Sequence, residues 1–192
     1  MSSDFGAKAF GEVMQLGYVV EDIHSTALEW VERVGAGPFY VIDRQPFDNY
    51  FYRGEKVELE LSIAFGYWGD MQVELIKPLN DARTFYTDAL ATGAGRLNHY
   101  ATVVKDIDGL LQRNNLQDRV VQSGALASGI KFVYLEEYMP GGLHLELVEA
   151  TEQALQGYAG MRAVARNWDG CDPVRSIMSL GEDLAQLQKA GQ

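Results

Sequence analysis

The sequence has a single cysteine, few basic residues and no long hydrophobic run. Cys171 alone cannot form an intrachain disulfide and gives no partner for a thiolate metal cluster. The chain has 16 Lys and Arg against 27 Asp and Glu, a net charge of −11, which disfavours nucleic acid or an anionic membrane as a partner. No apolar run approaches the roughly 18 residues of a membrane span, and residues 1–6 lack the basic and apolar regions of a signal peptide. We therefore expect a cytoplasmic protein whose partner is a small molecule.

The length and composition predict one folded domain with an appendage. At 192 residues and 47% hydrophobic content, the chain is long enough to bury a substantial core. We predict a domain over residues 1–150 and an extension over residues 151–192, because an internal repeat ends near Ala150.

The two copies of this repeat begin alike. Residues 15–23 and 99–107 align without a gap, and each segment contains the end of a strand and an acidic residue that can cap a helix. The alignment places Gln15 opposite His99. Each of these two side chains projects from its strand together with small or apolar neighbours.

The two copies also end alike. Residues 73–76 and 145–148 are matching strands, which places Glu74 opposite Glu146. A carboxylate among apolar neighbours is costly to bury unless it is paired or coordinated. The closing strands therefore point to a site rather than to an ordinary core.

The repeat predicts two modules of β-α-β-β-β order, over residues 12–78 and 97–149. The predicted strands are residues 13–20, 57–65, 71–76, 97–104, 131–138 and 143–148. The predicted helices follow Asp22 and Asp106 or cover residues 81–91, 151–166 and 173–189, the last with Asp172 as its cap. The predicted loops are residues 38–53, which are rich in aromatics, and residues 123–129.

Equivalent polar positions in two modules predict one metal site built from two halves. The candidate ligands are Gln15, Glu74, His99 and Glu146. One nitrogen and three oxygen donors are typical of a divalent ion such as Zn, Ni, Co, Mn or Fe(II). Alone, Gln15 or His99 would be interpreted as a hydrogen-bonded strand side chain, and the repeat favours the metal. His144 shares the strand face of Glu146 and is interpreted as an outer-shell group or a substrate contact.

Three short segments resemble a known family. Residues 73–80, 97–100 and 145–147 are similar to ligand strands of the vicinal oxygen chelate superfamily (glyoxalase, bleomycin resistance protein and dioxygenase), within it the methylmalonyl-CoA epimerase-like branch. The resemblance covers about residues 12–149. It implies an α+β fold with two paired βαβββ modules that form a curved mixed sheet around the metal, here followed by a helical C-terminal extension. It also implies the same ligand set, in the order Gln15, Glu74, His99 and Glu146.

The sequence also departs from some branches of this family. Glyoxalase I enzymes are expected to carry arginines for the glutathione carboxylates where this chain has Val19 and Gly95, although Arg96 is adjacent. Glutathione is therefore disfavoured as a substrate. Ring-cleaving dioxygenases hold Fe(II) with two histidines and one carboxylate, whereas the corresponding set here contains only His99, which disfavours dioxygenase chemistry.

The resemblance implies an isomerase, epimerase or lyase that transfers a proton next to a metal-bound carbonyl or thioester. Glu146 is expected to be both ligand and base, and Glu60 the second acid or base, with Glu58 as the alternative on the same strand. The aromatics of residues 38–53 favour an apolar or ring-bearing substrate. The alternative function is a binding protein that sequesters its ligand without metal. The chain is also expected to form a homodimer.

Overall fold

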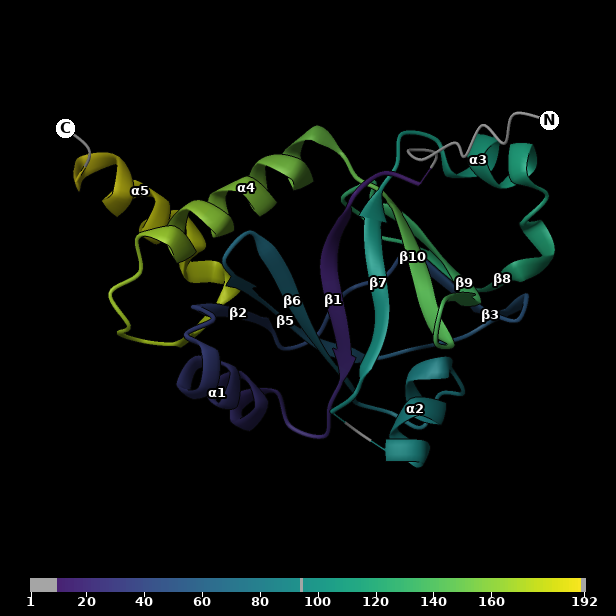
Figure 1. Ribbon diagram of the computed structural model, residues 1–192, viewed down its shortest axis with the longest axis horizontal. Coiled ribbons are helices and arrows are strands. Elements are labelled where there is room, and N and C mark those ends of the chain that lie inside the picture. The colour runs from purple at the N-terminus through teal and green to yellow at the C-terminus, as the bar shows by residue number, and fades with distance from the viewer. Residues whose placement is uncertain (1–9, 94, 191–192) are drawn as a thin grey trace.

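The computed structural model describes residues 10–93 and 95–190, which form a mixed sheet of 11 strands with helices packed around it (Figure 1). The first module consists of β1 (Val13–Val19), α1 (Ile23–Val34), β2 (Phe39–Ile42), β3 (Asn49–Tyr52), β4 (Glu55–Lys56), β5 (Leu61–Trp68) and β6 (Met71–Pro78). The second module follows α2 (Phe85–Gly93) and consists of β7 (Leu97–Val103), α3 (Ile107–Asn114), the 3-10 turn η1 (Gln117–Arg119), β8 (Val120–Ala125), β9 (Lys131–Met139) and β10 (Leu143–Glu149). The C-terminal segment consists of α4 (Glu152–Arg166), β11 (Val174–Ser176), the 3-10 turn η2 (Ile177–Ser179) and α5 (Leu180–Ala190).

The strand order confirms two modules joined side by side. It runs β11-β2-β5-β6-β1-β7-β10-β9-β8-β3-β4. In each module the first strand pairs in parallel with the last, β1 with β6 and β7 with β10, and the modules meet where β1 runs antiparallel to β7. The predicted α+β class is confirmed, and the repeated segments occupy the four central strands of the sheet.

The two faces of the sheet are covered differently. On one face, Ile23 and Ala27 of α1 pack against strands of the first module, and Ile107 and Leu110 of α3 pack against strands of the second. On the other face the central strands carry the candidate ligands, surrounded by a separate cluster that includes Tyr134. Alternation along each strand thus separates the structural core from the site.

The helices of both modules begin as the repeat predicts. The side chain of Asp22 accepts a hydrogen bond from the backbone N–H of Ser25 at 2.8 Å, and that of Asp106 accepts one from Gly109 at 2.8 Å. Each carboxylate thereby satisfies a backbone donor of the first turn. Gly35, with φ of 69°, ends α1 in the left-handed conformation that glycine adopts without strain.

Several predicted loops and strand bounds are wrong. Residues 38–53 contain β2 and β3, and residues 123–129 begin within β8. The strand predicted over residues 57–65 starts only at Leu61 and runs to Trp68. β3 forms because it pairs with β8, with Asn49 opposite Ala125, and such a distant partner leaves no local pattern in the sequence.

The β3–β4 hairpin belongs to the first module in sequence and to the second in space. Figure 1 shows β2 and β3, which are consecutive in the chain, at opposite ends of the sheet. Residues 43–48 and 57–60 must therefore cross between the two modules. A hydrogen bond of 2.8 Å from the backbone N–H of Gln45 to the carbonyl of Leu61 joins the outgoing segment to β5.

The C-terminal segment packs on the first module. The helix predicted over residues 173–189 is wrong in its first part, where Asp172 has a left-handed φ of 46° and β11 pairs in parallel with β2. Arg175 of β11 forms an ion pair of 2.9 Å with Asp183 of α5, and Asp183 also accepts a hydrogen bond of 2.6 Å from the Tyr40 hydroxyl. Among the described residues, no helix is long and apolar enough to cross a membrane.

Candidate metal centre

The four candidate ligands lie on the four central strands. Gln15 is on β1, Glu74 on β6, His99 on β7 and Glu146 on β10. Gly17 of β1 is paired with Glu74 on one side and with His99 on the other, so these two candidate ligands lie on the two strands that flank β1. All four ligand candidates are buried.

Three of the four side chains converge on one point. The Nε2 atom of His99 lies 3.4 Å from a carboxylate oxygen of Glu74 and 3.4 Å from one of Glu146. One ligand atom from each residue lies within 4.8 Å of the others. His99 is fully inaccessible and the two glutamates are each 7% exposed.

The Gln15 amide is oriented by a chain of buried hydrogen bonds. Its Nε2 donates to Oε1 of Gln72 at 2.7 Å, and Gln72 Nε2 donates to the Tyr67 hydroxyl at 3.0 Å. The Tyr67 hydroxyl in turn donates to the backbone carbonyl of Tyr158 in α4, also at 3.0 Å. Because the amide nitrogen of Gln15 is used in this chain, its oxygen is the atom left free for a metal.

His99 is oriented from the second module and accommodated by the first. Its Nδ1 lies 3.1 Å from the Asn98 side-chain oxygen, which leaves Nε2 as the nitrogen available to a metal. The ring lies over Gly17, where an added Cβ would be 1.9 Å from Cε1 of His99. Glycine is therefore required at this position of β1, because any side chain would displace the imidazole.

Opposing charges shift the pKa values of these groups. Burial alone would lower the pKa of His99, but the carboxylates of Glu146 and Glu74 outweigh burial and raise it to about 9. Burial raises the pKa of Glu74, and the charge of Glu146 raises it further while His99 opposes the shift.

Unpartnered atoms in the group fit a metal ion. A carboxylate oxygen of Glu74 and Nε2 of His99 are buried without a hydrogen-bond partner among the described residues. Buried polar atoms normally form hydrogen bonds, and each buried atom left without one costs about 1–3 kcal/mol of stability. A divalent ion held by these atoms and by Glu146 and Gln15 would satisfy them and balance the two carboxylates.

A small cavity of about 70 Å³ opens beside the group. Gln15, Glu74 and Glu146 form its polar side, and apolar side chains such as Phe47 and Phe132 form much of the rest. Tyr158 of α4 also lines it, so the C-terminal segment contributes to the wall.

Tyrosines complete the polar lining of this cavity. Tyr86 of α2 and Tyr134 of β9 both line it, and their hydroxyls are 2.8 Å apart. Burial raises the pKa of Tyr86 and of Tyr134 well above the ordinary phenol value, and the charge of Glu146 raises both further. The two phenols therefore stay protonated and can act as hydrogen-bond donors.

Three other candidates lie elsewhere. The structure does not bring Glu60 into the cavity, because β5 starts one residue later and the Glu60 carboxylate instead forms an ion pair with Arg44. Glu58 is also outside, within 3.4 Å of the Lys56 ammonium. His144 is not part of the metal group. Its Nδ1 accepts a hydrogen bond from a backbone N–H at 3.1 Å, and its ring packs on a phenylalanine of α2.

Sequence reasoning missed the residues that surround the ligands. Gln72 has a signal, since it is a polar residue two positions before Glu74 on the same strand face. Tyr67 and Tyr158 have none, because their roles depend on the docking of α4 against β5, which no local pattern reveals.

Comparisons with known proteins agree with this arrangement. The family model described as the glyoxalase/bleomycin resistance protein/dioxygenase superfamily matches residues 14–134. A search of curated proteins found no match.

Two solved structures have a similar fold. Methylmalonyl-CoA epimerase from Mycobacterium tuberculosis superposes with a TM-score of 0.57 at 16% identity, over 78% of this chain and 94% of its own. A hypothetical protein from Bacillus halodurans C-125 superposes with a TM-score of 0.53 at 19% identity, over 74% of this chain and 96% of its own. At these identities the likeness is one of fold. The family match over most of the domain establishes that the chain belongs to the glyoxalase/bleomycin resistance protein/dioxygenase superfamily.

Proposed function

We propose that the chain is a metal-dependent isomerase or epimerase, or a lyase, that acts by transferring a proton from the carbon next to a carbonyl or thioester group. The single observation that carries this proposal is the convergence of two buried carboxylates and an imidazole, with unpartnered atoms, beside a cavity whose remaining walls are largely apolar. A protein that only sequesters an apolar ligand has no need for two buried glutamates.

Each candidate ligand has a defined role in the proposal. Gln15, Glu74, His99 and Glu146 would hold one divalent ion, with the amide oxygen of Gln15 directed by Gln72. When bound, the ion supplies Lewis-acid polarisation of a carbonyl oxygen and so favours removal of the adjacent proton.

Glu146 is assigned the proton transfer. Its carboxylate lines the cavity and would accept the proton from the α-carbon, whose bonding electrons move toward the carbonyl group. Return of the proton to the same carbon gives exchange or epimerisation, and return to a different carbon gives isomerisation. The Tyr134 hydroxyl, which accepts a hydrogen bond from that of Tyr86, would donate one inside the cavity, and the apolar walls would exclude water.

Hydrogen exchange tests the proposal. The metal-loaded protein is incubated in D₂O with acyl-CoA thioesters and with α-substituted or β,γ-unsaturated ketones, and deuterium is measured by mass spectrometry. We expect metal-dependent incorporation that Glu146→Gln abolishes. The matched control is Glu60→Gln, which removes a carboxylate outside the cavity and is expected to retain exchange. Metal-independent ligand binding without exchange would support a sequestering protein, and oxygen consumption with a catechol would support a dioxygenase.

We also propose that the chain forms a homodimer. The outer strands of the sheet, β11 and β4, have only three and two residues, so an edge-to-edge contact would be short. Exposed apolar side chains of α1 and its surroundings, Leu28, Val34 and Trp68, favour a contact through a face instead. Light scattering of the purified protein measures its mass directly, and a monomer would contradict the proposal.

A further inference from the structure

Among the described residues, the charged side chains that line the cavity are both carboxylates. Glu74 and Glu146 face into it, and the described residues that line it include no lysine or arginine. A bound divalent ion would balance the two carboxylates and leave no net positive charge for a second anionic group. The electrostatics of the cavity thus favour a substrate whose body, meaning the part away from the metal-bound carbonyl group, carries no charge.

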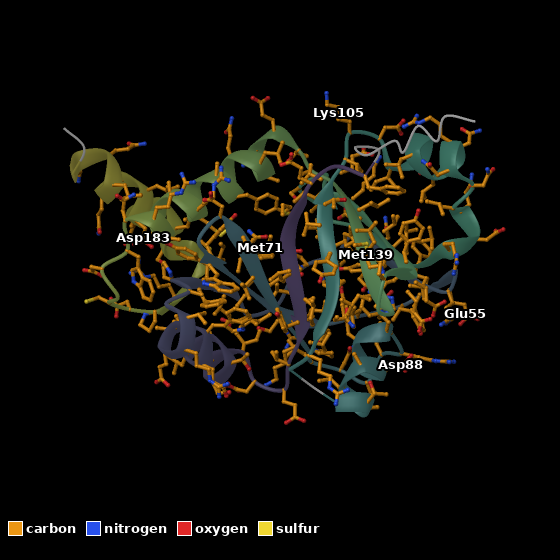
Figure 2. The ribbon with its side chains drawn as sticks, viewed as in Figure 1. Glu55, Met71, Asp88, Lys105, Met139 and Asp183 are labelled. Atoms are coloured by element: carbon orange, nitrogen blue, oxygen red, sulfur yellow. The ribbon has the colours of Figure 1, made fainter. Side chains whose placement is uncertain are left out.

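Arginines of the surrounding segments do not line the cavity. Arg44 is paired with Glu60, and Arg53 forms an ion pair of 2.5 Å with Glu136. Arg162, one turn after Tyr158 on α4, does not line the cavity, and its charge lowers the pKa of the Tyr67 hydroxyl. The same outward placement of charge is visible in Figure 2, where Glu55, Asp88 and Lys105 lie toward the periphery of the molecule.

The walls of the cavity are suited to a compact apolar group. Phe47 comes from the segment that crosses between the modules, and Phe132 comes from β9, with their ring centroids 6.1 Å apart. Ligand pockets for larger molecules commonly have about 300–1,000 Å³. The volume of about 70 Å³ is far smaller.

Tyr158 limits the cavity on the side of the C-terminal segment. Its ring lines the cavity, and its backbone carbonyl ends the hydrogen-bond chain that begins at Gln15. Glu74 and Glu146 line the same cavity as this ring. α4 follows the last strand of the second module, so this wall comes from outside the two repeated modules.

We infer that the site takes an uncharged carbonyl compound with a compact apolar body, and that Tyr158 limits the length of that body. The inference rests on the proposed function, since the metal is what would bind the carbonyl group. A carboxylate on the body of the substrate would be buried without a cation, which is strongly unfavourable. An acyl-CoA whose acyl group carries a carboxylate is accordingly excluded in favour of a neutral ketone or a simple acyl group.

A matched pair of probes tests the charge preference. Butanohydroxamate and the monohydroxamate of succinic acid share a chelating head and differ at the far end, where the second carries a carboxylate. Binding to Co(II)-loaded protein is followed by the visible spectrum of the ion. We expect the anionic probe to bind at least roughly 30-fold more weakly. Equal or tighter binding of the anionic probe would overturn the inference.

Metal retention is measured first and separately, by elemental analysis of the Co(II)-loaded protein. Its absence would contradict the proposed function, and with it this inference. Metal retention together with equal binding of the two probes would contradict only the inference.

A longer probe tests the role of Tyr158. Octanohydroxamate should bind the wild type poorly and bind Tyr158→Ala about tenfold more tightly or better, because the added methylenes can then be buried. Tyr158→Phe keeps the ring and should retain the wild-type preference for the short probe, and Tyr158→Leu serves if the alanine variant does not fold. The backbone acceptor for Tyr67 is present in each variant. If the ratio of the affinities for octanohydroxamate and butanohydroxamate is the same in the truncated variants as in the wild type, Tyr158 does not limit the length of the substrate.

Discussion

The two modules position equivalent ligands by different means. In the first, the Gln15 amide is directed by a chain of hydrogen bonds through Gln72 and Tyr67 that ends at the backbone of Tyr158 in α4. The ligand of the first module therefore depends on a segment that lies outside the repeat.

In the second module the support is local. His99 is oriented by its sequence neighbour Asn98, and its ring fills the space left by Gly17 of the other module. The repeated backbone pattern thus fixes the strand positions of the candidate ligands. The side chains that orient each candidate ligand differ between the two modules. The comparison predicts that changes in the tail disturb Gln15 far more than His99.

The largest effect is expected from removal of residues 151–192. The cut exposes Tyr40 and Tyr67, which pack against Met161 and Val164 of α4. We expect the midpoint of thermal unfolding to fall by more than about 10 °C or the protein to become insoluble. Calorimetry measures the change. The control is Met178→Ser in the intact chain, since that side chain is 84% exposed and its replacement should leave the midpoint unchanged.

Removal of the imidazole should abolish the metal site. His99→Ala leaves Glu74 and Glu146 buried close together without the nitrogen that links them. We expect metal affinity to fall by more than the roughly 100-fold that is the upper range for outer-shell partners. Gln15→Ala should have a smaller effect, because an amide is a neutral and weaker donor. Titration with Zn, Co, Ni and Mn followed by elemental analysis checks both variants. Equal losses of metal affinity in the two variants would contradict the predicted difference between the modules.

The pH dependence should come from the second module, since the Gln15 amide cannot titrate. The pKa of His99 is raised to about 9 in the folded protein without an ion, against about 6.5 in an unfolded chain. Its contribution to stability is present below pH 6.5 and is lost as the pH rises through 9. The raised pKa of Glu74 acts in the same direction.

We therefore expect chelator-treated protein to lose on the order of 3 kcal/mol of unfolding free energy at most between these pH values. The metal-loaded protein should lose much less, because an ion replaces the proton. Urea unfolding at several pH values measures the unfolding free energy of both forms. The same pH dependence in the two forms would contradict the assignment of this effect to His99.

The support of Gln15 can be tested apart from the ligand itself. Gln72→Leu keeps the volume of a fully buried side chain and removes the acceptor of the Gln15 amide. We expect metal affinity to fall roughly 10- to 100-fold. Tyr67→Phe removes one hydroxyl further along the chain and should cost less than Gln72→Leu. If neither change affects metal binding while Asn98→Ala does, the amide of Gln15 is not a ligand.

The sequence predicts the positions of the ligands because these depend on two local signals. Strand alternation places Glu74 and Glu146 on one face, and the repeat makes Gln15 and His99 equivalent, so the convergence of the glutamates and the histidine follows without a structure. The prediction for Glu60 rested on the family resemblance, with Glu58 as the alternative, and both residues precede β5, which begins at Leu61.

The surroundings of the site could not be predicted in this way. β3 joins the main sheet through β8, although it also pairs with its neighbour β4, and Tyr158 reaches the cavity because α4 packs against β5. Both arrangements join segments far apart in the chain. Their formation depends on the free energy of packing in the complete fold, which short patterns of residues do not encode.

The crossing hairpin has a consequence for the order of folding. β3 pairs with β8, with Asn49 opposite Ala125, and Phe47 of the crossing segment lines the cavity. The β3–β4 hairpin of the first module can therefore pair with the sheet only after β8 of the second module has been synthesised. Contacts between such distant residues form late and slowly because the loop between them must first be closed. The first half of the chain is thus not expected to fold as an independent unit, and the cavity is completed only when both halves have been made.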